Sequence, residues 1–205
     1  MSNIESKERP DIAHVDRCVH FGECGGCESQ DLPYPRQLER KAAALRELFS
    51  GFWNSPISVE PSPEIWYYRN KIDLTFGRKY YDEPPPKGIE RESVLGYKRR
   101  GRWYAPLEVE ECRLFTPDLP PLLDSVRAWM RSRGLKAYNS RRDEGLLRIL
   151  LLRQGKRTGQ RMVVLVTRHE DFDRQGFVDA VRAPWPDIAS VQWALYTGRA
   201  DVAAG

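Results

Sequence analysis

Apolar residues recur at two different periods along this chain, and the change of period separates expected helices from expected strands. Steps of three and four residues predict helices with one apolar face. This pattern is found over 34–53, 119–133 and 172–182. It is clearest in the first segment, where the apolar positions are Leu38, Ala42, Leu45, Phe49 and Phe52.

Strict alternation of apolar and polar residues distinguishes the segment 68–76. Ile72, Leu74 and Phe76 fall on one side, and the residues between them are polar. This predicts a strand with one buried face. Shorter apolar runs predict further strands at 94–97, 102–104, 146–152, 162–167 and 188–196. Together with the helices they predict an α+β fold, a largely antiparallel sheet with flanking helices.

The net charge of +4 is small, but basic residues are unevenly distributed. The segment 131–161 carries ten Lys or Arg against two acids, and 87–104 carries six against two. Local basic clusters favour a polyanionic partner such as nucleic acid. A solvated charged surface is the alternative that charge alone leaves open.

Aromatic residues alternate with cations in the segment 97–104. Cations neutralise phosphates, and flat rings can stack on unpaired bases. The cations are Lys98, Arg99, Arg100 and Arg102, and the rings are Tyr97, Trp103 and Tyr104. Packing of the rings against the sheet is an equally compatible interpretation. A further basic pair, Arg141 and Arg142, is expected in a loop and is a second candidate for RNA contact.

Four cysteines are the strongest candidate for chemistry. Cys18, Cys24 and Cys27 lie in CVHFGECGGC, and Cys112 lies far along the chain in EVEECRLF. The N-terminal residues are polar and no apolar run reaches 18 residues, so we expect neither a secretory signal nor a membrane span. A cytoplasmic protein keeps its thiols reduced. Four thiolates then suit either tetrahedral zinc or an iron–sulfur cluster.

The spacing of the cysteines favours a cluster over zinc. Zinc sites more often combine two separate Cys-x2-Cys pairs, whereas this chain has one such pair, an upstream cysteine and a remote one. Gly22, Gly25 and Gly26 would let the backbone approach a bulky group and turn N–H groups toward sulfur. Zinc remains the alternative. The neighbouring His20 is more readily interpreted as a packing or hydrogen-bonding residue than as a ligand.

The cysteine loop and the helix after it resemble a known family. CVHFGECGGCESQDLPYPRQLERKAAAL is similar to the cluster loop and following helix of the 5-methyluridine-forming RNA methyltransferases of bacterial tRNA and rRNA. YRNK at 68–71 resembles a strand of that family's central domain, and Cys112 falls where the family places its fourth cluster ligand. LRILLLR at 147–153 and MVVLV at 162–166 resemble its next hairpin.

The resemblance implies a site and a partner. It implies a [4Fe–4S] cluster on Cys18, Cys24, Cys27 and Cys112, and structured RNA, either rRNA or tRNA, as the partner. It also adds Arg69 and Lys71 to the expected RNA contacts, because they lie on the strand that resembles the family's RNA-facing surface.

The family's chemistry is expected to be absent from this chain. Its catalytic domain binds S-adenosylmethionine on a Rossmann-like sheet and uses a nucleophilic cysteine. Here no Gly-rich nucleotide loop is present and no cysteine follows Cys112. We therefore expect no catalytic residue and no S-adenosylmethionine site in this chain, and no activity without a separate or downstream catalytic domain.

These expectations divide the chain into five parts. They are a flexible lead-in (1–17), a cluster loop (18–33), a helix that packs on the absent catalytic domain (34–53), an α+β RNA-binding central domain (54–197) and a truncated junction (198–205). Two alternatives remain open: a stand-alone RNA-binding module without catalysis, with a cluster or zinc as its staple, and a zinc-stabilised domain that binds another partner.

Overall fold

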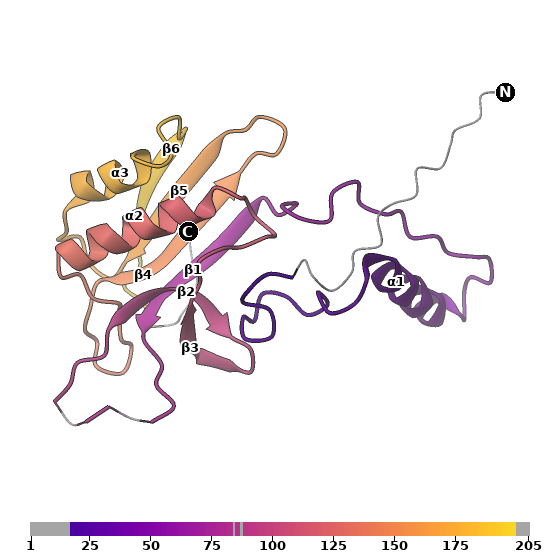
Figure 1. The fold of residues 1–205 in the computed structure, drawn as a ribbon, viewed down its shortest axis with the longest axis horizontal. Helices are drawn as coiled ribbons and strands as arrows, with labels where there is room; N and C mark the ends of the chain where they lie inside the picture. Colours follow the sequence, from indigo (N-terminus) through magenta and orange to yellow (C-terminus); the bar gives the residue numbers. More distant parts are fainter. Residues whose placement is uncertain (1–16, 84, 87, 200–205) are drawn as a thin grey trace.

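The computed structural model describes residues 17–83, 85–86 and 88–199 and contains one six-stranded sheet (Figure 1). The strands are β1 (Lys71–Arg78), β2 (Ser93–Arg99), β3 (Arg102–Glu108), β4 (Leu147–Gln154), β5 (Arg161–Thr167) and β6 (Ser190–Leu195). Their order across the sheet is β3-β2-β1-β4-β5-β6. All neighbouring pairs are antiparallel except β5 and β6. The predicted α+β fold is confirmed, with a mixed sheet that is antiparallel in every pair but one.

The single parallel pair exists because a helix joins its strands. Parallel neighbours cannot be connected by a hairpin and need a crossover. Here the crossover is α3 (Arg174–Arg182), between β5 and β6. Its N-terminus is capped by Asp173, whose Oδ1 accepts a hydrogen bond of 2.8 Å from the Gly176 backbone N–H.

Two helices, α2 (Leu119–Ser132) and α3, pack on one face of the sheet and enclose the core (Figure 1). α2 buries the apolar side of its surface, including Leu122, Val126 and Met130. These side chains meet the alternate apolar residues of β1, which are almost fully buried. Gly134, with a φ of +59°, ends the helical segment in the left-handed conformation that glycine favours.

The helix α1 (Tyr34–Phe49) stands apart from the sheet (Figure 1). It ends a turn earlier than predicted: the backbone N–H groups of Phe52 and Trp53 both bond to the Phe49 carbonyl in a closing turn. None of its residues is buried. Leu48 is 71% exposed, and Phe52 just after the helix is 90% exposed. The apolar stripe of α1 is therefore only partly covered, because Leu38, Ala42 and Leu45 are half-buried.

Some predicted boundaries were wrong for reasons of pairing. The strand expected from residue 68 begins at Lys71, because Tyr67 and Arg69 donate their backbone N–H groups to Arg113 and Leu114 instead. The strand expected at 102–104 extends to Glu108, whose partner in β2 is Gly96. Residues 1–16 and 200–205 lie outside the described part, so most of the predicted lead-in and junction is not placed. Among the described residues, no helix has the length and apolarity needed to cross a membrane.

Candidate functional site

The four cysteines converge on one small cavity. Cys18, Cys24 and Cys27 reach it from the N-terminal loop, and Cys112 reaches it from the segment after β3. All four are free thiols, and Cys24 and Cys112 are buried. The fold therefore brings together the cysteines that the sequence separates by more than eighty residues.

Backbone pairing attaches the cysteine loop to the β2–β3 turn. Cys24 forms an isolated antiparallel bridge with Arg99. The Gly25 N–H donates to the Lys98 carbonyl (3.0 Å), and the Arg100 N–H donates to the Glu23 carbonyl (2.8 Å). A Cβ on Gly25 would lie 3.0 Å from the same Lys98 oxygen. Glycine at this position lets the two backbones approach closely.

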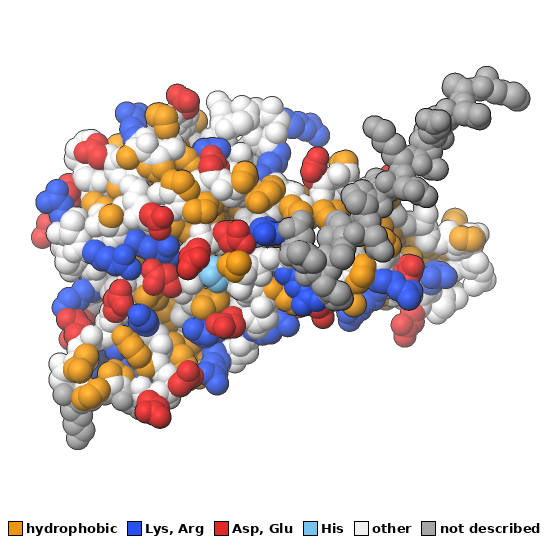
Figure 2. Space-filling view, in the orientation of Figure 1, with side chains coloured by type: hydrophobic (Ala, Val, Ile, Leu, Met, Phe, Trp, Pro, Cys, Tyr) orange, Lys and Arg blue, Asp and Glu red, His pale blue; other side chains and the backbone are white. Residues whose placement is uncertain are grey.

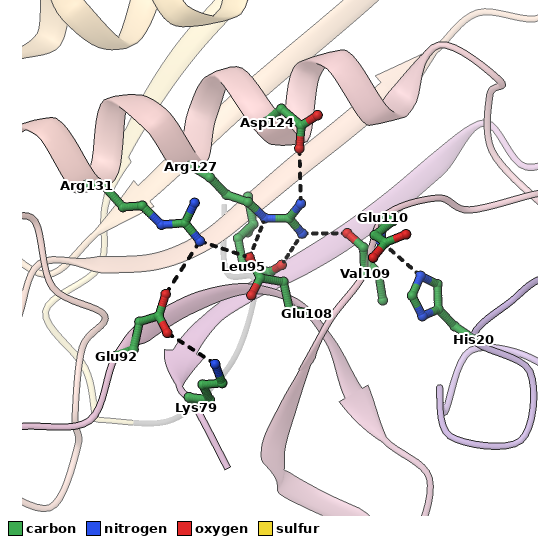
Figure 3. A network of polar contacts seen from close by, with 10 residues as sticks. All are labelled: His20, Lys79, Glu92, Leu95, Glu108, Val109, Glu110, Asp124, Arg127 and Arg131. Atoms are coloured by element: carbon green, nitrogen blue, oxygen red, sulfur yellow. Dashed lines mark hydrogen bonds and ion pairs between the residues drawn. The ribbon is translucent and has the colours of Figure 1, made fainter. Parts of the chain in front are cut away.

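Cys112 is positioned by contacts on several sides. Its carbonyl accepts a hydrogen bond from the Phe115 N–H (3.0 Å), and its Sγ accepts one from the Tyr97 hydroxyl (3.6 Å). Nearby, Nε2 of His20 accepts a bond of 2.9 Å from the Glu110 N–H (Figure 3). His20 therefore acts here as a hydrogen-bond acceptor that connects the cysteine loop to the segment of Cys112.

Buried thiols resist ionisation at this site. Burial raises the pKa of Cys18 to about 11 and also raises the pKa of Cys24 and Cys27. Neighbouring sulfurs add to the effect, because each thiolate would repel the next. A bound cation reverses this balance, since coordination favours the thiolate.

The side chains around the cavity offer sulfur ligands. In the described part of the chain, no three His, Cys, Asp or Glu side chains are grouped so that they could hold a metal ion. The four sulfurs nevertheless line one cavity, and the Gly26 N–H points at Sγ of Cys24 from 3.4 Å. Four thiols and a backbone donor directed at sulfur are the groups that an iron–sulfur cluster uses.

A basic groove of about 780 Å³ lies beside the cysteine loop. Gly25 and Gly26 form part of its wall. It collects six of the predicted RNA contacts: Arg69, Lys71, Lys98, Arg99, Arg100 and Arg102. Glu28 and Asp73 are the acidic residues that line it. The sequence therefore identified these cations, but their assembly into one groove depends on the pairing of β1, β2 and the cysteine loop.

Several groove cations also hold the site together. Arg99 pairs with Glu23 at 2.7 Å, and Arg100 donates to the Cys27 carbonyl. Arg69 donates to the Gly26 carbonyl at 3.4 Å. Lys71 pairs with Asp73 at 3.0 Å on the sheet face opposite the helices. These interactions connect the groove directly to the loop that carries three of the cysteines.

The remaining predicted contacts do not line this groove. Arg141 and Arg142 lie in the turn between α2 and β4. The side chain of Trp103 lies outside the described part, whereas Tyr104 is 62% exposed. On the face shown in Figure 2, acidic and basic side chains are interspersed. The groove is thus a local concentration of positive charge.

Sequence reasoning missed Arg127, a buried cation near the site (Figure 3). Its guanidinium donates to the carbonyls of Leu95 (2.9 Å) and Val109 (2.5 Å) and pairs with Glu108 at 3.0 Å. It thereby joins α2 to β2 and to the segment that leads to Cys112. Its position on α2, where apolar residues recur at three- and four-residue steps, was the available signal: a cation beside such a stripe needs buried acceptors.

Comparison with known proteins finds relatives among RNA-modifying enzymes, whereas no family model matches the chain. The chain is 32% identical over 190 residues to the tRNA (uracil(54)-C(5))-methyltransferase of Pyrococcus horikoshii, covering 92% of this chain and 40% of that protein. It is 34% identical over 173 residues to an uncharacterized RNA methyltransferase of Clostridium tetani, covering 82% and 36%.

A solved structure shows the same relationship. The crystal structure of Pyrococcus abyssi tRNA (uracil-54, C5)-methyltransferase in complex with S-adenosyl-L-homocysteine matches this fold with a TM-score of 0.68 and 27% identity. The match covers 89% of this chain and 39% of that one. The chain therefore spans about two fifths of the length of the relatives it matches.

Proposed function

We propose that this chain, which belongs to the family of RNA uracil-5-methyltransferases, is the part of such an enzyme that binds RNA and holds an iron–sulfur cluster. The observation that carries the proposal is the position of the basic groove directly against the loop of Cys18, Cys24 and Cys27. One wall serves both sites, so a group that stabilises the loop also shapes the RNA surface.

The cluster would be held by the four cysteines. A cluster of several irons is larger than one ion, so its ligands stand farther apart than those of zinc. The four thiols that line one cavity supply the number of ligands that such a cluster needs. The cluster would stabilise a loop that has almost no apolar core of its own. With all four thiols as ligands, no iron is left open for substrate, which supports a structural role.

RNA would bind along the groove through phosphates and bases. Lys98 and Arg100 line the groove, and Tyr104 is exposed on the neighbouring strand β3. Cations of this kind bind phosphates, and exposed rings stack unpaired bases. An enzyme that modifies a base must take that base out of its helical stack, which a basic surface beside an exposed ring would assist. The partner class is structured RNA, either tRNA or rRNA.

Methyl transfer would need residues beyond those of this chain. All four cysteines are assigned to the cluster, so none is left as a nucleophile. The S-adenosylmethionine site would lie in the part of the relatives that the chain does not span, and the exposed face of α1 would pack against it. Purified chain mixed with S-adenosylmethionine and tRNA is expected to form no 5-methyluridine. Product formation would overturn this part of the proposal.

Metal analysis tests the cluster. After anaerobic purification we expect about four irons and four sulfides per chain with a visible absorption band, since four cysteines bind a [4Fe–4S] cluster. Cys112→Ala should lose the band, whereas Tyr104→Phe, on the preceding strand β3 and outside the cavity, should keep it. Circular dichroism of both variants separates cluster loss from unfolding. One zinc per colourless chain would contradict the cluster and leave the fold unchanged.

Fluorescence anisotropy with a labelled tRNA transcript tests the groove. Binding should weaken steeply with salt, because phosphate contacts release counterions. Lys98→Gln should weaken binding and reduce the salt slope by about one, as expected for one lost phosphate contact. The control is Arg182→Gln, which removes the same charge from α3. Absent or salt-independent binding would contradict the proposal and favour a domain that binds another kind of partner.

A further inference from the structure

A second group of arginines gathers at the opposite end of β1 from the basic groove. Arg78 ends β1, Arg91 precedes β2, and Arg142 lies in the turn before β4. All three line a cavity of about 600 Å³, closed on one side by the C-terminal end of α2. We call this cavity the arginine pocket. Three segments far apart in the sequence thus place their guanidinium groups around one space.

Among the described residues, no hydrogen bond or salt bridge joins these guanidinium groups to another side chain, and the charge of Glu144 acts on Arg78. Two of the acids that line the arginine pocket already pair with other cations. Glu90 forms a salt bridge of 2.7 Å with Lys136, and Glu92 forms salt bridges with Lys79 and Arg131. Glu144 is the remaining carboxylate in the lining. Three arginines therefore face one unpaired acid, and the arginine pocket keeps an uncompensated positive charge.

Mutual repulsion is evident at Arg78. Burial, and then the charges of Arg142 and Arg91, lower the pKa of its guanidinium. Arginine still stays protonated in proteins. Like charges that outnumber the acids around them are stabilised when an anion binds between them. Their planar forks suit a phosphate group, which accepts paired hydrogen bonds from arginine.

The arginine pocket is separate from the groove. Lys71 and Arg78 lie at the two ends of β1, about 23 Å apart at the usual rise per residue of a strand. Lys71 belongs to the open face of the sheet, whereas Arg78 falls on the same side of β1 as the buried Ile72 and Phe76. In Figure 1 the loop that follows β1 lies at the lower left, away from the cysteine loop and α1.

We propose that the arginine pocket binds a backbone phosphate of the same RNA that occupies the groove, as a second anchor beyond the site of modification. This rests on the proposed function. The observations favour nucleic acid over an acidic protein, because the chain already carries a groove for phosphates and the two sites are separated by a distance that a folded RNA spans. A second anchor would select folded RNA over short single strands.

The test is anisotropy with a folded tRNA transcript and the double variant Arg91→Gln/Arg142→Gln. Both residues lie outside strands and helices, so the fold should persist, and circular dichroism checks this. Loss of one phosphate contact should weaken binding about tenfold at 0.1 M salt and reduce the salt slope by about 0.9. The matched control is Arg157→Gln/Arg182→Gln, which removes the same charge elsewhere and should change affinity less than about twofold.

Three results would overturn the inference. Equal weakening by both double variants would mean that only net charge matters. Unchanged RNA affinity in Arg91→Gln/Arg142→Gln, with weakening in Lys98→Gln, would reject the arginine pocket while the groove stands. Unchanged RNA binding together with lost binding of polyglutamate would assign the pocket to an acidic protein. If neither Lys98→Gln nor the double variant affects RNA binding, the proposed function itself fails.

Discussion

Residues 17–70 and the sheet domain that follows are stabilised in different ways. In the first region Cys24 is the only buried residue among those described, and α1 buries nothing. The sheet domain instead has a continuous apolar core between its strands and α2 and α3. Burial of apolar surface is the main driving force of folding. The first region therefore depends on other contacts: backbone pairing to the β2–β3 turn, the cysteine cavity and whatever covers α1.

The two regions contribute differently to the basic groove. The sheet domain has an apolar core, and its strands β1 and β2 form one wall of the groove. The cysteine loop supplies the other wall and has little that fixes it except polar contacts to that sheet. A cluster at the cysteines would therefore act on the half of the groove that needs it, while the half built on the sheet stays unchanged.

The largest expected effect comes from the core. Leu150 is fully buried in the central strand β4, so Leu150→Ala should lower the free energy of unfolding by about 2–5 kcal/mol. Leu48→Ala, the same change on exposed α1, should alter it by less than about 0.5 kcal/mol. Urea unfolding measures both. Equal losses would mean that α1 belongs to the cooperative unit.

Arg127 is the next test, because it connects α2 to the strands. Arg127→Met should cost about 1–3 kcal/mol, since the carbonyls of Leu95 and Val109 lose a buried donor. Arg131→Met is the control: this residue shares the partner Glu108 but is exposed, and it should cost less than about 1 kcal/mol. If Arg127→Met leaves the free energy of unfolding unchanged, the apolar packing of methionine compensates for the lost hydrogen bonds.

Two glycines with similar backbone conformations sharpen the comparison of regions. Gly145 has φ +91°, and a Cβ there would lie 2.3 Å from the Ala137 carbonyl oxygen; Gly22 has φ +96° and open space around it. Gly145→Ala should lower the free energy of unfolding by about 1–3 kcal/mol through strain, with the clash adding to it. Gly22→Ala carries the same strain but lies in the cysteine loop, so it should destabilise that loop and leave the unfolding of the sheet nearly unchanged. Thermal and urea denaturation distinguish these outcomes.

The smallest effect on stability is expected at the exposed end of α1. Phe52→Glu should leave the free energy of unfolding within about 0.5 kcal/mol of the original. It should reduce self-association, because exposed apolar surface promotes contact between molecules. Sedimentation velocity measures this. Ile89→Glu, an exposed apolar residue of the loop after β1, is the control and should not change association. If neither variant changes the degree of self-association, the molecules associate through another surface.

Local pattern was sufficient to predict most of the elements. Alternation at Ile72, Leu74 and Phe76 predicted β1 because a buried face selects every second residue. Pattern could not predict where β1 begins, because Tyr67 and Arg69 pair with residues more than forty positions away. The parallel pairing of β6 with β5 was missed for a similar reason, since the apolar pattern of a strand does not show whether it pairs parallel or antiparallel.

The candidate site divides in the same way. The type and spacing of Cys18, Cys24 and Cys27 indicated their chemistry, and Lys98–Arg102 indicated a basic segment. The arginine pocket was only partly indicated: the sequence marked Arg142, with Arg141, as a candidate RNA contact, but nothing in it grouped Arg142 with Arg78 and Arg91. Arg127 was missed because its acceptors are backbone carbonyls on other elements.

By itself, the sequence determined the residue types, the periods of the helices and strands, and the resemblance carried by the cysteine loop. These are properties of short segments, where neighbours along the chain decide the outcome. The resemblance already placed Cys112 with the other three thiols, and the tertiary structure brings all four to one cavity. Only the tertiary structure decided that six cations share one groove and that arginines from three separate segments surround a cavity. Such sites depend on strand pairing and on the packing of α2, which link residues by distance in space.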